Sequence, residues 1–519
     1  MNNRSRRTFI AVCAVLLYLL LVFLLQLVEK GAPDATITSF PMALWYSLTT
    51  LTTVGYGDTY PVTVAGKVIG AVFQLLSLGL LVFLVGMIVS LMRGKFWMLK
   101  LRSLRKHPWY IFNEDNPAAE ALAENLRAEQ PQAVILFSDR RAGDLSADPS
   151  RLTLSLPMSV REMVEYHRER AATQVICISE DPRVNDMLAD SLQDLPCSIC
   201  SRTDHEPEVI PENLTLFDEE SCMARLYWQK YPVLTVSEKI ILIGDGPFAE
   251  ALLLQALQQN VVDAYSRIKY VVFGDYDNFR RNHPYLDQVV TVGSKDDTCD
   301  TLHFIRQPWN TNKDLLAAAD RIIVCCKTET ETASITAQLL TNFPLNGTVY
   351  ARLSSPFAGA VVFGSLKETY TPELVLRTQL DATARKLHQM YCDSTGGGKP
   401  WGELSGFTRR SNLASADHLS MKIRYLLGPK ADGTLSAEQC RMAADAFEES
   451  DEFIRDLCRR IEHERWTRFH LLNNWQYDAV RDNKKRRHPL LVPFDTLSPE
   501  DQAKDDYSWE LLKDLSRKE

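Results

Sequence analysis

The sequence lacks the residue patterns that several classes of protein require. Its eleven cysteines are scattered, and Cys197-Ser-Ile-Cys200 has neither a second cysteine pair nor nearby histidines, which disfavours a zinc site. The net charge of −8 is mildly acidic and argues against nucleic acid as a main partner. No nucleophile stands with a base in a recognisable catalytic set, so we expect no catalytic residues and no enzymatic activity.

Charged residues are missing from long stretches near the N-terminus. Thr8–Val28 is an almost unbroken hydrophobic run, and Val68–Met92 contains no charged residue. Each has the roughly 20 residues that a helix needs to cross about 30 Å of hydrocarbon. Basic residues flank both stretches: Arg4, Arg6 and Arg7 before the first, and Arg93, Lys95, Lys100, Arg102, Arg105 and Lys106 after the second. The two stretches indicate a multi-pass protein of the lipid bilayer, and by the positive-inside bias we expect both termini to be cytoplasmic. We expect the membrane to be a bacterial-type inner membrane.

Between these stretches lies Thr49–Asp58, which reads Thr-Thr-Leu-Thr-Thr-Val-Gly-Tyr-Gly-Asp. This decapeptide resembles the selectivity filter of potassium channels. A dehydrated K+ needs oxygens in place of its water shell, and the backbone carbonyls of a narrow loop supply them. Glycine at alternate positions fits this role, because carbonyls that all face one axis force alternating backbone hands. The expected filter residues are Thr53, Val54, Gly55, Tyr56, Gly57 and Asp58, with permeant K+ as the only bound metal.

The flanks of this segment fit the same resemblance. Met42–Thr50, which follows Pro41, is a short amphipathic stretch of the kind expected for a re-entrant pore helix. Trp45 and Tyr56 would brace the filter from behind. One chain provides a quarter of such a filter, so the resemblance implies a homotetramer.

The second apolar stretch departs from the family pattern. The position at which relatives often carry a hinge glycine is Ser77. Gly79 and Gly86 lie further along, as the candidates for a gating hinge. Glycine in a membrane helix also serves close packing alone, so both interpretations stay open for Gly79.

The region after Lys106, roughly 410 residues long, has no further membrane stretch and implies two to four domains. Two parts of it share a βαβ rhythm. The expected strands are Trp109–Phe112, Ala133–Phe137, Thr173–Ser179 and Cys197–Ser201 in the first part, and Lys239–Ile243, Tyr270–Phe273, Arg321–Cys326 and Thr348–Leu353 in the second. Continuous Val/Ile/Leu strands that alternate with helices indicate doubly wound parallel sheets.

Paired Rossmann-like units after a two-span pore resemble the RCK domains (regulator of potassium conductance, with a TrkA-N type of nucleotide-binding unit). The resemblance covers roughly Pro108 to Leu380. Because both units lie on one chain, four chains would supply eight units and complete a cytoplasmic gating ring.

These units differ at the turn where a nucleotide would bind. The first, Asn113–Ala118, has no glycine and carries carboxylates that oppose a pyrophosphate, so we expect it to be structural or to bind a cation. The second, Gly244–Ala249, stands between a strand and a helix in the required context. Pro247 removes one donor amide, so nucleotide binding and simple inheritance of the turn are equal alternatives. The candidate nucleotide-binding residues are Gly244, Asp245, Gly246, Ala249 and Asp275, the last for a ribose.

The C-terminal part follows a glycine-rich linker, Thr395–Gly402. We expect helices at Leu413–Leu427 and Ala437–His470. Four short motifs then occur, at Glu462–Trp466, Asn474–Asp478, Arg481–Lys485 and His488–Phe494. Their spacing resembles that of the RyR domain, a small repeat named from ryanodine receptors. The resemblance implies a helical pair whose connecting loop is the ligand surface.

A basic run in this loop lies beside aromatic residues. Cations with aromatic faces suit a planar anionic ligand, which describes a nucleotide such as an adenine nucleotide, cyclic di-AMP or NAD. A solvated basic surface above core aromatics is the alternative. The candidate ligand residues are Trp475, Tyr477, Arg481, Lys484, Lys485, Arg487 and Phe494. His463, His470 and His488 are too dispersed in the sequence to predict a metal site.

The sequence therefore predicts a multidomain, ligand-gated potassium channel. The expected domains are an α-helical two-span pore (1–106), two α/β RCK domains (107–235 and 236–395), a helical linker (396–434) and a mainly α-helical RyR domain (435–519). The alternatives are a regulatory subunit of a separate potassium uptake or efflux protein, and a membrane-anchored NAD-dependent redox sensor.

Overall fold

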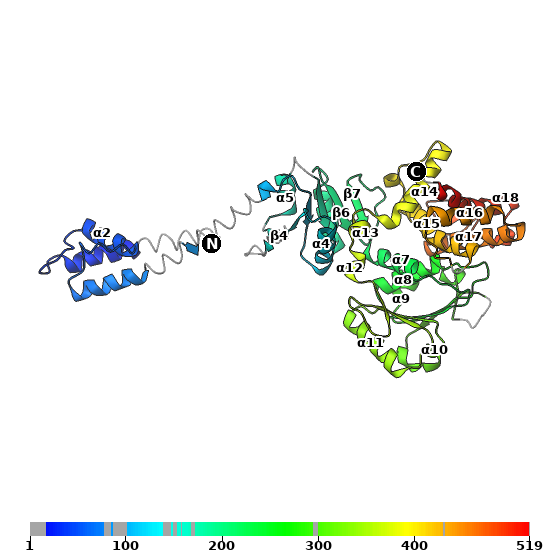
Figure 1. The fold of residues 1–519 in the computed structure, drawn as a ribbon, viewed down its shortest axis with the longest axis horizontal. Helices are drawn as coiled ribbons and strands as arrows, with labels where there is room; N and C mark the ends of the chain where they lie inside the picture. The colour runs from blue at the N-terminus through cyan, green and yellow to red at the C-terminus, as the bar shows by residue number, and fades with distance from the viewer. Residues whose placement is uncertain are drawn as a thin grey trace. The chain divides into compact units, whose positions relative to one another are not determined.

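The chain divides into two units, residues 1–105 and residues 106–519 (Figure 1). The computed structural model describes residues 17–76, 85–86, 101–138, 147–148, 153–156, 158–167, 172–293, 299–428 and 431–517. Ser77, Gly79 and the basic residues from Arg93 to Lys100 lie outside the described residues.

The N-terminal unit is helical where it is described. Residues 17–29 and 64–76 are helical, and helix α2 (Phe40–Leu51) lies between them in the chain, close to the expected pore helix. Pro41 stands in the first turn of α2, where a missing N–H costs nothing. Val22, Leu25, Ala43 and Phe73 form the buried core of this unit. None of the helices in the described ranges combines the length and the hydropathy of a membrane span.

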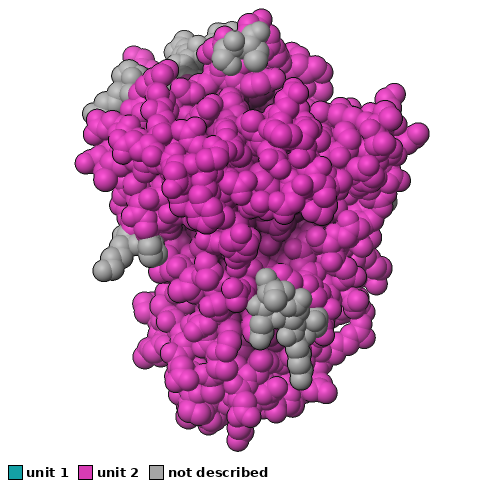
Figure 2. Space-filling model, turned by 90° about the vertical axis from the view of Figure 1, so that its right-hand side faces the viewer, with its two compact units in different colours: residues 1–105 teal, residues 106–519 magenta. Residues whose placement is uncertain are grey.

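Among its described residues, the larger unit contains two sheets of seven strands each and one small sheet of two strands. Figure 2 shows one face of this unit. The first sheet has the order β3-β4-β2-β1-β5-β6-β7, and only the β3–β4 pair is antiparallel. Its strands are β1 (Trp109–Phe112), β2 (Val134–Ser138), β3 (Ala147–Asp148), β4 (Thr153–Leu156), β5 (Thr173–Cys177), β6 (Ser198–Arg202) and β7 (Leu214–Phe217). Its helices are α4 (Pro117–Glu129), α5 (Val160–His167), α6 (Pro182–Ser191) and α7 (Glu219–Lys230).

The second sheet is parallel throughout, with the order β10-β11-β9-β8-β12-β13-β14. Its strands are β8 (Lys239–Ile243), β9 (Lys269–Phe273), β10 (Thr291–Val292), β11 (Thr301–Ile305), β12 (Arg321–Val324), β13 (Thr348–Arg352) and β14 (Val361–Phe363). The helices that follow are α8 (Pro247–Gln259), α9 (Asp277–Asn282), α10 (Lys313–Ala317), α11 (Glu329–Asn342), α12 (Leu366–Thr369) and α13 (Pro372–Val375). Parallel α/β sheets were predicted and are confirmed.

The two sheets exchange helices. Met223, Tyr227 and Trp228 of α7 pack in the core of the second sheet, beside α8, although α7 follows the first sheet in the chain (Figure 1). In return, Tyr370 and Val375 of the α12–α13 segment are buried in the core of the first sheet. Each core is therefore completed by residues from the other half of this region.

The C-terminal part is mainly helical and packs on the second sheet. Its helices are α14 (Ala382–Thr395), α15 (Gly406–Leu427), α16 (Ala437–Glu448), α17 (Glu452–Leu472), α18 (Pro499–Ala503) and α19 (Tyr507–Ser516), with the short strands β15 (Gln476–Tyr477) and β16 (Arg487–His488). The stretch Ala437–His470, predicted to be helical, is helical except for residues 449–451, which separate α16 from α17. Asp451 accepts a hydrogen bond from the Ile454 amide (2.9 Å) and so caps a new helix, α17.

Candidate functional site

The filter segment leaves the C-terminal end of α2 with an alternating backbone. Thr53, Gly55 and Gly57 have φ of 61°, 53° and 74°, while Val54 and Tyr56 between them do not have positive φ. A positive φ in a β-branched residue such as Thr53 is strained and persists only where surrounding structure enforces it. Alternating backbone hands are what successive carbonyls need in order to face one side, as a row of cation sites requires.

Two residues hold this segment from behind, as the sequence predicted. The rings of Trp45 and Tyr56 are stacked, with centroids 5.8 Å apart and an angle of 2° between their planes. The Trp45 indole Nε1 donates to Asp58 Oδ2 at 2.9 Å. Helix α2 therefore fixes both the middle and the outer end of the filter segment.

A buried carboxylate holds the chain beyond the filter, and sequence reasoning missed it. Glu29 is fully buried and accepts hydrogen bonds from the Val62 amide (2.9 Å), the Thr63 amide (3.0 Å) and the Thr63 hydroxyl (2.6 Å). A side chain at Gly66 would place its Cβ 1.9 Å from Glu29 Oε1, so the backbone is shaped around this carboxylate. The only signal in the sequence was an acidic residue directly after an apolar run.

The hinge candidates have different outcomes. Gly86 lies in the short helical piece 85–86, and a Cβ there would meet no atom within 4 Å. Gly79 lies outside the described residues. The choice between a hinge and a packing role therefore stays a prediction.

In the first α/β unit, side chains fill the turn where a nucleotide would bind. Asn113 Oδ1 accepts from the Ile178 amide (2.7 Å), and Asn113 Nδ2 donates to Asn185 Oδ1 (3.2 Å). Asn116 donates to the Ile178 carbonyl (2.9 Å) and caps α4. These bonds tie the end of β1 to the segment after β5. The turn contains no glycine, so its backbone N–H groups cannot come close to a phosphate.

The second turn keeps the required backbone. Gly244 has φ 136° and Gly246 has φ 96°. A Cβ on Gly244 would lie 2.3 Å from the Cys325 carbonyl oxygen, so this glycine is needed for the close approach of β8 to β12 whether or not a ligand binds. A Cβ on Gly246 would meet only the flexible Lys327 side chain, at 3.3 Å. Ala249 is fully buried against the second sheet, and Asp275 is exposed with its amide 3.3 Å from Asp245 Oδ2.

Lys327 is a cation at this turn that the sequence did not reveal. Lys327 comes shortly after β12, the strand that neighbours β8 on the side opposite β9. Its Nζ lies 3.1 Å from Asp245 Oδ1. The Lys327 side chain passes close to Gly246, with its Cγ and Cε 3.3 Å from the position that a Cβ would take. An anionic ligand at the glycine turn would compete with Asp245 for this ammonium group.

Two of the expected aromatic ligand residues in the C-terminal part are core residues, and those predictions were wrong. Trp475 is 4% exposed and packs on Phe407, with ring centroids 4.9 Å apart. Phe494 is 7% exposed and lies under the Arg460 guanidinium at 4.7 Å. These rings contribute to the core, because burying a large aromatic side chain stabilises the folded state.

Of the remaining candidates, Arg481, Lys484 and Lys485 lie on the exposed loop between β15 and β16. Tyr477 is the last residue of β15, and the half-buried Arg487 is the first residue of β16. Tyr477 is 55% exposed, and the Asp482 and Arg487 backbones pair to close a tight turn with Lys484 and Lys485 at its tip. Arg481 donates to Asn483 Oδ1 (2.9 Å), and Arg487 donates to Gln476. The structure therefore brings four basic side chains and one aromatic face together, without Trp475 and Phe494.

The three C-terminal histidines are closer than their sequence spacing suggested. The His470 and His488 rings are 5.9 Å apart, and both contact Trp466. Burial lowers the pKa of His470 to about 3 and that of His488 to about 4. Among the described residues, no three potential ligands form a group that could hold a metal ion.

The C-terminal part is anchored to the second sheet by buried contacts. Leu471 and Leu472, at the end of α17, belong to the core of that sheet. Arg468 pairs with Asp300 at 2.8 Å, and the other oxygen of Asp300 accepts from the Ile268 amide at 2.6 Å. The C-terminal end of α17 is therefore part of the packed core of the second α/β unit.

A second buried anchor joins four parts of the chain at Asp417 of α15. Arg225 of α7 donates to both Asp417 oxygens (2.7 and 3.0 Å) and to Asp381 (2.7 Å). Gln255 of α8 also donates to Asp417, at 3.1 Å. Helix α8 begins at the glycine turn and carries Gln255. A shift of α8 would therefore change the hydrogen bond between Gln255 and Asp417 directly.

The described geometry defines a multidomain class of protein, with a helical N-terminal unit, parallel α/β units and a helical C-terminal part. Comparison with family models agrees for two segments. Residues 10–94 match the model described as an ion channel, and residues 445–517 match the RyR domain. The match places the similarity to ion channels within residues 10–94.

Individual relatives match the same N-terminal region. Over 62 residues the chain is 42% identical to the A-type voltage-gated potassium channel KCND3 of Rattus norvegicus and to that of Oryctolagus cuniculus. The match covers 12% of this chain and 10% of each relative, so the chain spans about a tenth of the length of the curated relatives it matches.

Solved structures of the GsuK channel overlap with more of the chain. The structure of GsuK bound to ADP is 15% identical and covers 72% of this chain and 99% of that chain, with a TM-score of 0.35. The GsuK channel bound to NAD is 12% identical and covers 73% of this chain and 86% of that chain, with a TM-score of 0.34. At these TM-scores the overlap implies nothing about ligand or mechanism.

Proposed function

We propose that the protein is a homotetrameric potassium channel of a bacterial inner membrane, gated by a cytoplasmic ring of RCK-type units. The observation that carries this proposal is the alternating backbone at Thr53, Gly55 and Gly57, held by the Trp45–Asp58 bond. It lies within the segment that matches the ion-channel family. Four copies of this segment around one axis would surround K+ with carbonyl oxygens.

Flux through purified full-length protein in liposomes tests this proposal. We expect K+ flux, with Na+ largely excluded, in the absence of any other protein. That result would also exclude the alternative of a regulatory subunit for a separate pore. Liposomes that stay impermeable to K+ under every ligand tested below, with correctly inserted tetramers, would contradict the proposal.

We further propose that an adenine nucleotide binds at the second α/β unit. Support comes from Gly246, whose Cβ position is approached by the flexible Lys327 side chain, from the N-terminus of α8 and from the Lys327 ammonium group, which could exchange Asp245 for a phosphate. Asp275 at the end of β9 is available to a ribose. The first unit offers no equivalent space, because Asn113, Asn116 and Asn185 bond across its turn.

The exposed C-terminal loop is the second proposed ligand surface. Tyr477, Arg481, Lys484, Lys485 and Arg487 together offer one aromatic face and four cations, which suits a nucleotide with more than one phosphate, such as cyclic di-AMP. Because its side chains are exposed, this surface would bind weakly at high salt.

Gating would follow from different affinities of a ligand for two shapes of the ring. A ligand at the glycine turn would act on α8, and Gln255 on that helix contacts the Asp417 anchor that joins α7, α8 and α15. No catalytic step is assigned to the chain. A nicotinamide-dependent absorbance change on turnover would favour the redox-sensor alternative.

A thermal shift screen of the full chain tests both ligand surfaces. ADP, NAD and cyclic di-AMP are the probes, and a ligand at 100 times its Kd stabilises the bound form by about 2.7 kcal/mol. We expect at least one probe to raise the Tm and to change K+ flux. If no probe does either, nucleotide gating is wrong while the channel proposal stands on its own test.

A further inference from the structure

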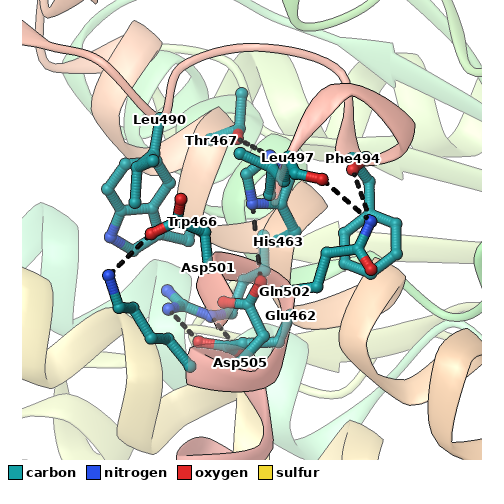
Figure 3. A network of polar contacts seen from close by, with 12 residues as sticks. Glu462, His463, Trp466, Thr467, Leu490, Phe494, Leu497, Asp501, Gln502 and Asp505 are labelled. Atoms are coloured by element: carbon teal, nitrogen blue, oxygen red, sulfur yellow. Dashed lines mark hydrogen bonds and ion pairs between the residues drawn. The ribbon is translucent and has the colours of Figure 1, made fainter. Parts of the chain in front are cut away.

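Helix α17 carries a histidine whose two ring nitrogens both face acceptors. His463 Nε2 lies 2.9 Å from the Val492 carbonyl oxygen, and Nδ1 lies 3.5 Å from Asp505 Oδ2. The ring is 5% exposed, so water has little access to either side. Figure 3 shows the imidazole between α17 and the segment that carries Asp501, Gln502 and Asp505.

A neutral imidazole cannot satisfy both of these contacts. Nε2 also lies 3.5 Å from the Thr467 hydroxyl, which can donate or accept, but the Val492 carbonyl has no proton to give, so the closer Val492 contact holds only while Nε2 carries a proton. The lone pair of a neutral Nδ1 would then face the Asp505 carboxylate, which is repulsive. The contact becomes attractive only when the His463–Asp505 pair holds one additional proton, on the imidazole or on the carboxyl group.

The charged surroundings favour this proton. Burial alone would lower the pKa of His463, but the Asp505 carboxylate, the Val492 carbonyl and the charge of Glu464 outweigh it and raise that pKa. Burial also raises the pKa of Asp505. The other ionisable groups near the pair are already engaged: Glu462 with Lys422 and Arg465, Arg460 with Asp456 and Asp495, and Lys504 with Asp501. His470 and His488 lie on the far side of Trp466 and have lowered pKa values.

Both contacts of His463 hold parts of the chain that follow the basic loop, residues 478–486 between β15 and β16. Val492 lies four residues after β16, which closes the loop, and Asp505 lies in the short helical turn Lys504–Asp506. The Gln502 side chain bonds to the Phe494 and Leu497 carbonyls (3.2 and 3.4 Å) and ties these two parts together (Figure 3). One proton therefore secures α17 to both sides of residues 489–506.

We propose that the His463–Asp505 pair is a proton-dependent latch that holds residues 489–506, and with them the basic loop, against α17. The latch is closed when the pair is protonated and weakens as the pH rises. It responds to cytoplasmic pH without a ligand, so it does not depend on the proposed nucleotide sites. Where a nucleotide does bind the loop, its affinity falls with rising pH.

Hydrogen exchange of the full chain in detergent or nanodiscs tests the latch. Exchange of peptides from 489–506 is measured at about pH 6 and about pH 8.5 and corrected for the intrinsic rates, with β8 (Lys239–Ile243) as internal reference. We expect protection of 489–506 to be greater at the lower pH, with the opening constant rising by at most about tenfold per pH unit for one proton. Protection of β8 should not follow this dependence.

Variants separate the latch from other titrations. Gln in His463→Gln can donate to Val492 but does not titrate, so the pH dependence of 489–506 should disappear, as it should in Asp505→Asn. His205→Gln, which changes an exposed histidine of the first α/β unit, should keep the wild-type response. Equal corrected protection at both pH values in the wild type, or an unchanged pH dependence in either latch variant, would overturn the proposal. If His463→Gln fails to fold, the wild type and Asp505→Asn decide.

Discussion

At the scale of single residues, the filter depends on conformations that few side chains adopt. Gly57 has φ 74°, and a Cβ at this position would meet no atom of its own chain within 4 Å, so its requirement is conformational before it is steric. The same holds for Gly55 at φ 53°. The positions of these glycines follow from the direction in which their carbonyls must point.

Gly57→Ala should abolish K+ flux in liposomes while the tetramer stays assembled. The strain of a positive φ, about 1–3 kcal/mol at a non-glycine residue, would be relieved by turning the carbonyl away from the axis. Gly396→Ala is the matched control, because Gly396 has φ 62° and equal space outside the pore unit. Sustained K+-selective flux in Gly57→Ala would show that the filter assignment is wrong.

Glu29→Gln should shorten the conducting state. The amide would turn an N–H group toward the Val62 and Thr63 donors, leaving buried polar groups unpaired at a cost of roughly 1–3 kcal/mol. We expect current that decays during sustained opening, with unchanged preference for K+ over Na+. The neighbouring exposed Lys30→Gln should behave as wild type. If the Glu29→Gln current is as stable as that of the wild type, the Glu29 carboxylate does not control how long the conducting state lasts.

Residue chemistry alone predicted some of these roles and missed others. The role of the filter segment stays a prediction, but the alternating backbone that its residue types imply is present at Thr53, Gly55 and Gly57. The role of Glu29 could not be predicted, because its partners lie more than thirty positions further along the chain. The predictions for Trp475 and Phe494 were wrong because an aromatic side chain looks the same in the sequence whether it stacks on a ligand or fills a core.

At the scale of elements, the central strands were predictable and the edges were not. β1, β5, β8 and β12 are short apolar runs because they are covered on both faces. β4 (Thr-Leu-Ser-Leu) and β7 (Leu-Thr-Leu-Phe) alternate polar and apolar residues over only four positions, which is too short for a periodic signal. The two-residue strands β3 and β10 carry no signal at all.

Gly246→Val at the start of α8 should remove nucleotide binding at the second turn while the second sheet stays folded. Valine is strained at φ 96°, and its side chain would press on Lys327, which is flexible enough to move. Binding of ADP or NAD by calorimetry and the Tm are the measurements. If the wild type binds neither probe at this turn, the turn is structural and Asp275 has no ligand role.

Gly244→Val is the contrasting variant. Its Cβ would lie 2.3 Å from the backbone oxygen of Cys325, and neither strand can yield without losing sheet hydrogen bonds. We expect loss of folded protein, seen as aggregation or a much lower Tm. The pair of variants therefore separates a glycine required by the sheet from one required by a ligand.

At the scale of the whole molecule, the C-terminal loop should act as an exposed ionic surface. Lys484→Ala with Lys485→Ala should weaken cyclic di-AMP binding by roughly 10–30-fold, because an exposed charge contact is worth up to about 1 kcal/mol after screening. Binding by the wild type should weaken with added salt, and that salt dependence should be smaller in the double variant. Replacing Lys313 and Lys367, which lie on the α/β units, is the matched control. Unchanged affinity in the loop variant would remove the loop from the ligand proposal.

Truncation after Leu427 should damage the second α/β unit rather than only remove a sensor. The cut removes Leu471 and Leu472 from a shared core and leaves Asp300 buried without Arg468. Breaking a buried ion pair by losing one partner costs roughly 3–5 kcal/mol. We expect poor expression and early loss of β8–β12 protection in hydrogen exchange. A well-folded truncated protein that still responds to nucleotides would show that the C-terminal part is dispensable for sensing.

The exchange of helices between the two sheets sets the order in which this protein can be made. The first sheet ends with Phe217, yet Tyr370 and Val375 complete its core. At about 5–20 residues per second, the ribosome needs on the order of ten seconds to supply the roughly 150 residues between them. Throughout that interval the nascent chain shows an unfinished apolar surface to the cytoplasm. Synthesis speed and chaperone supply, which no contact in the finished molecule records, therefore belong among the conditions that decide how much working protein a cell obtains.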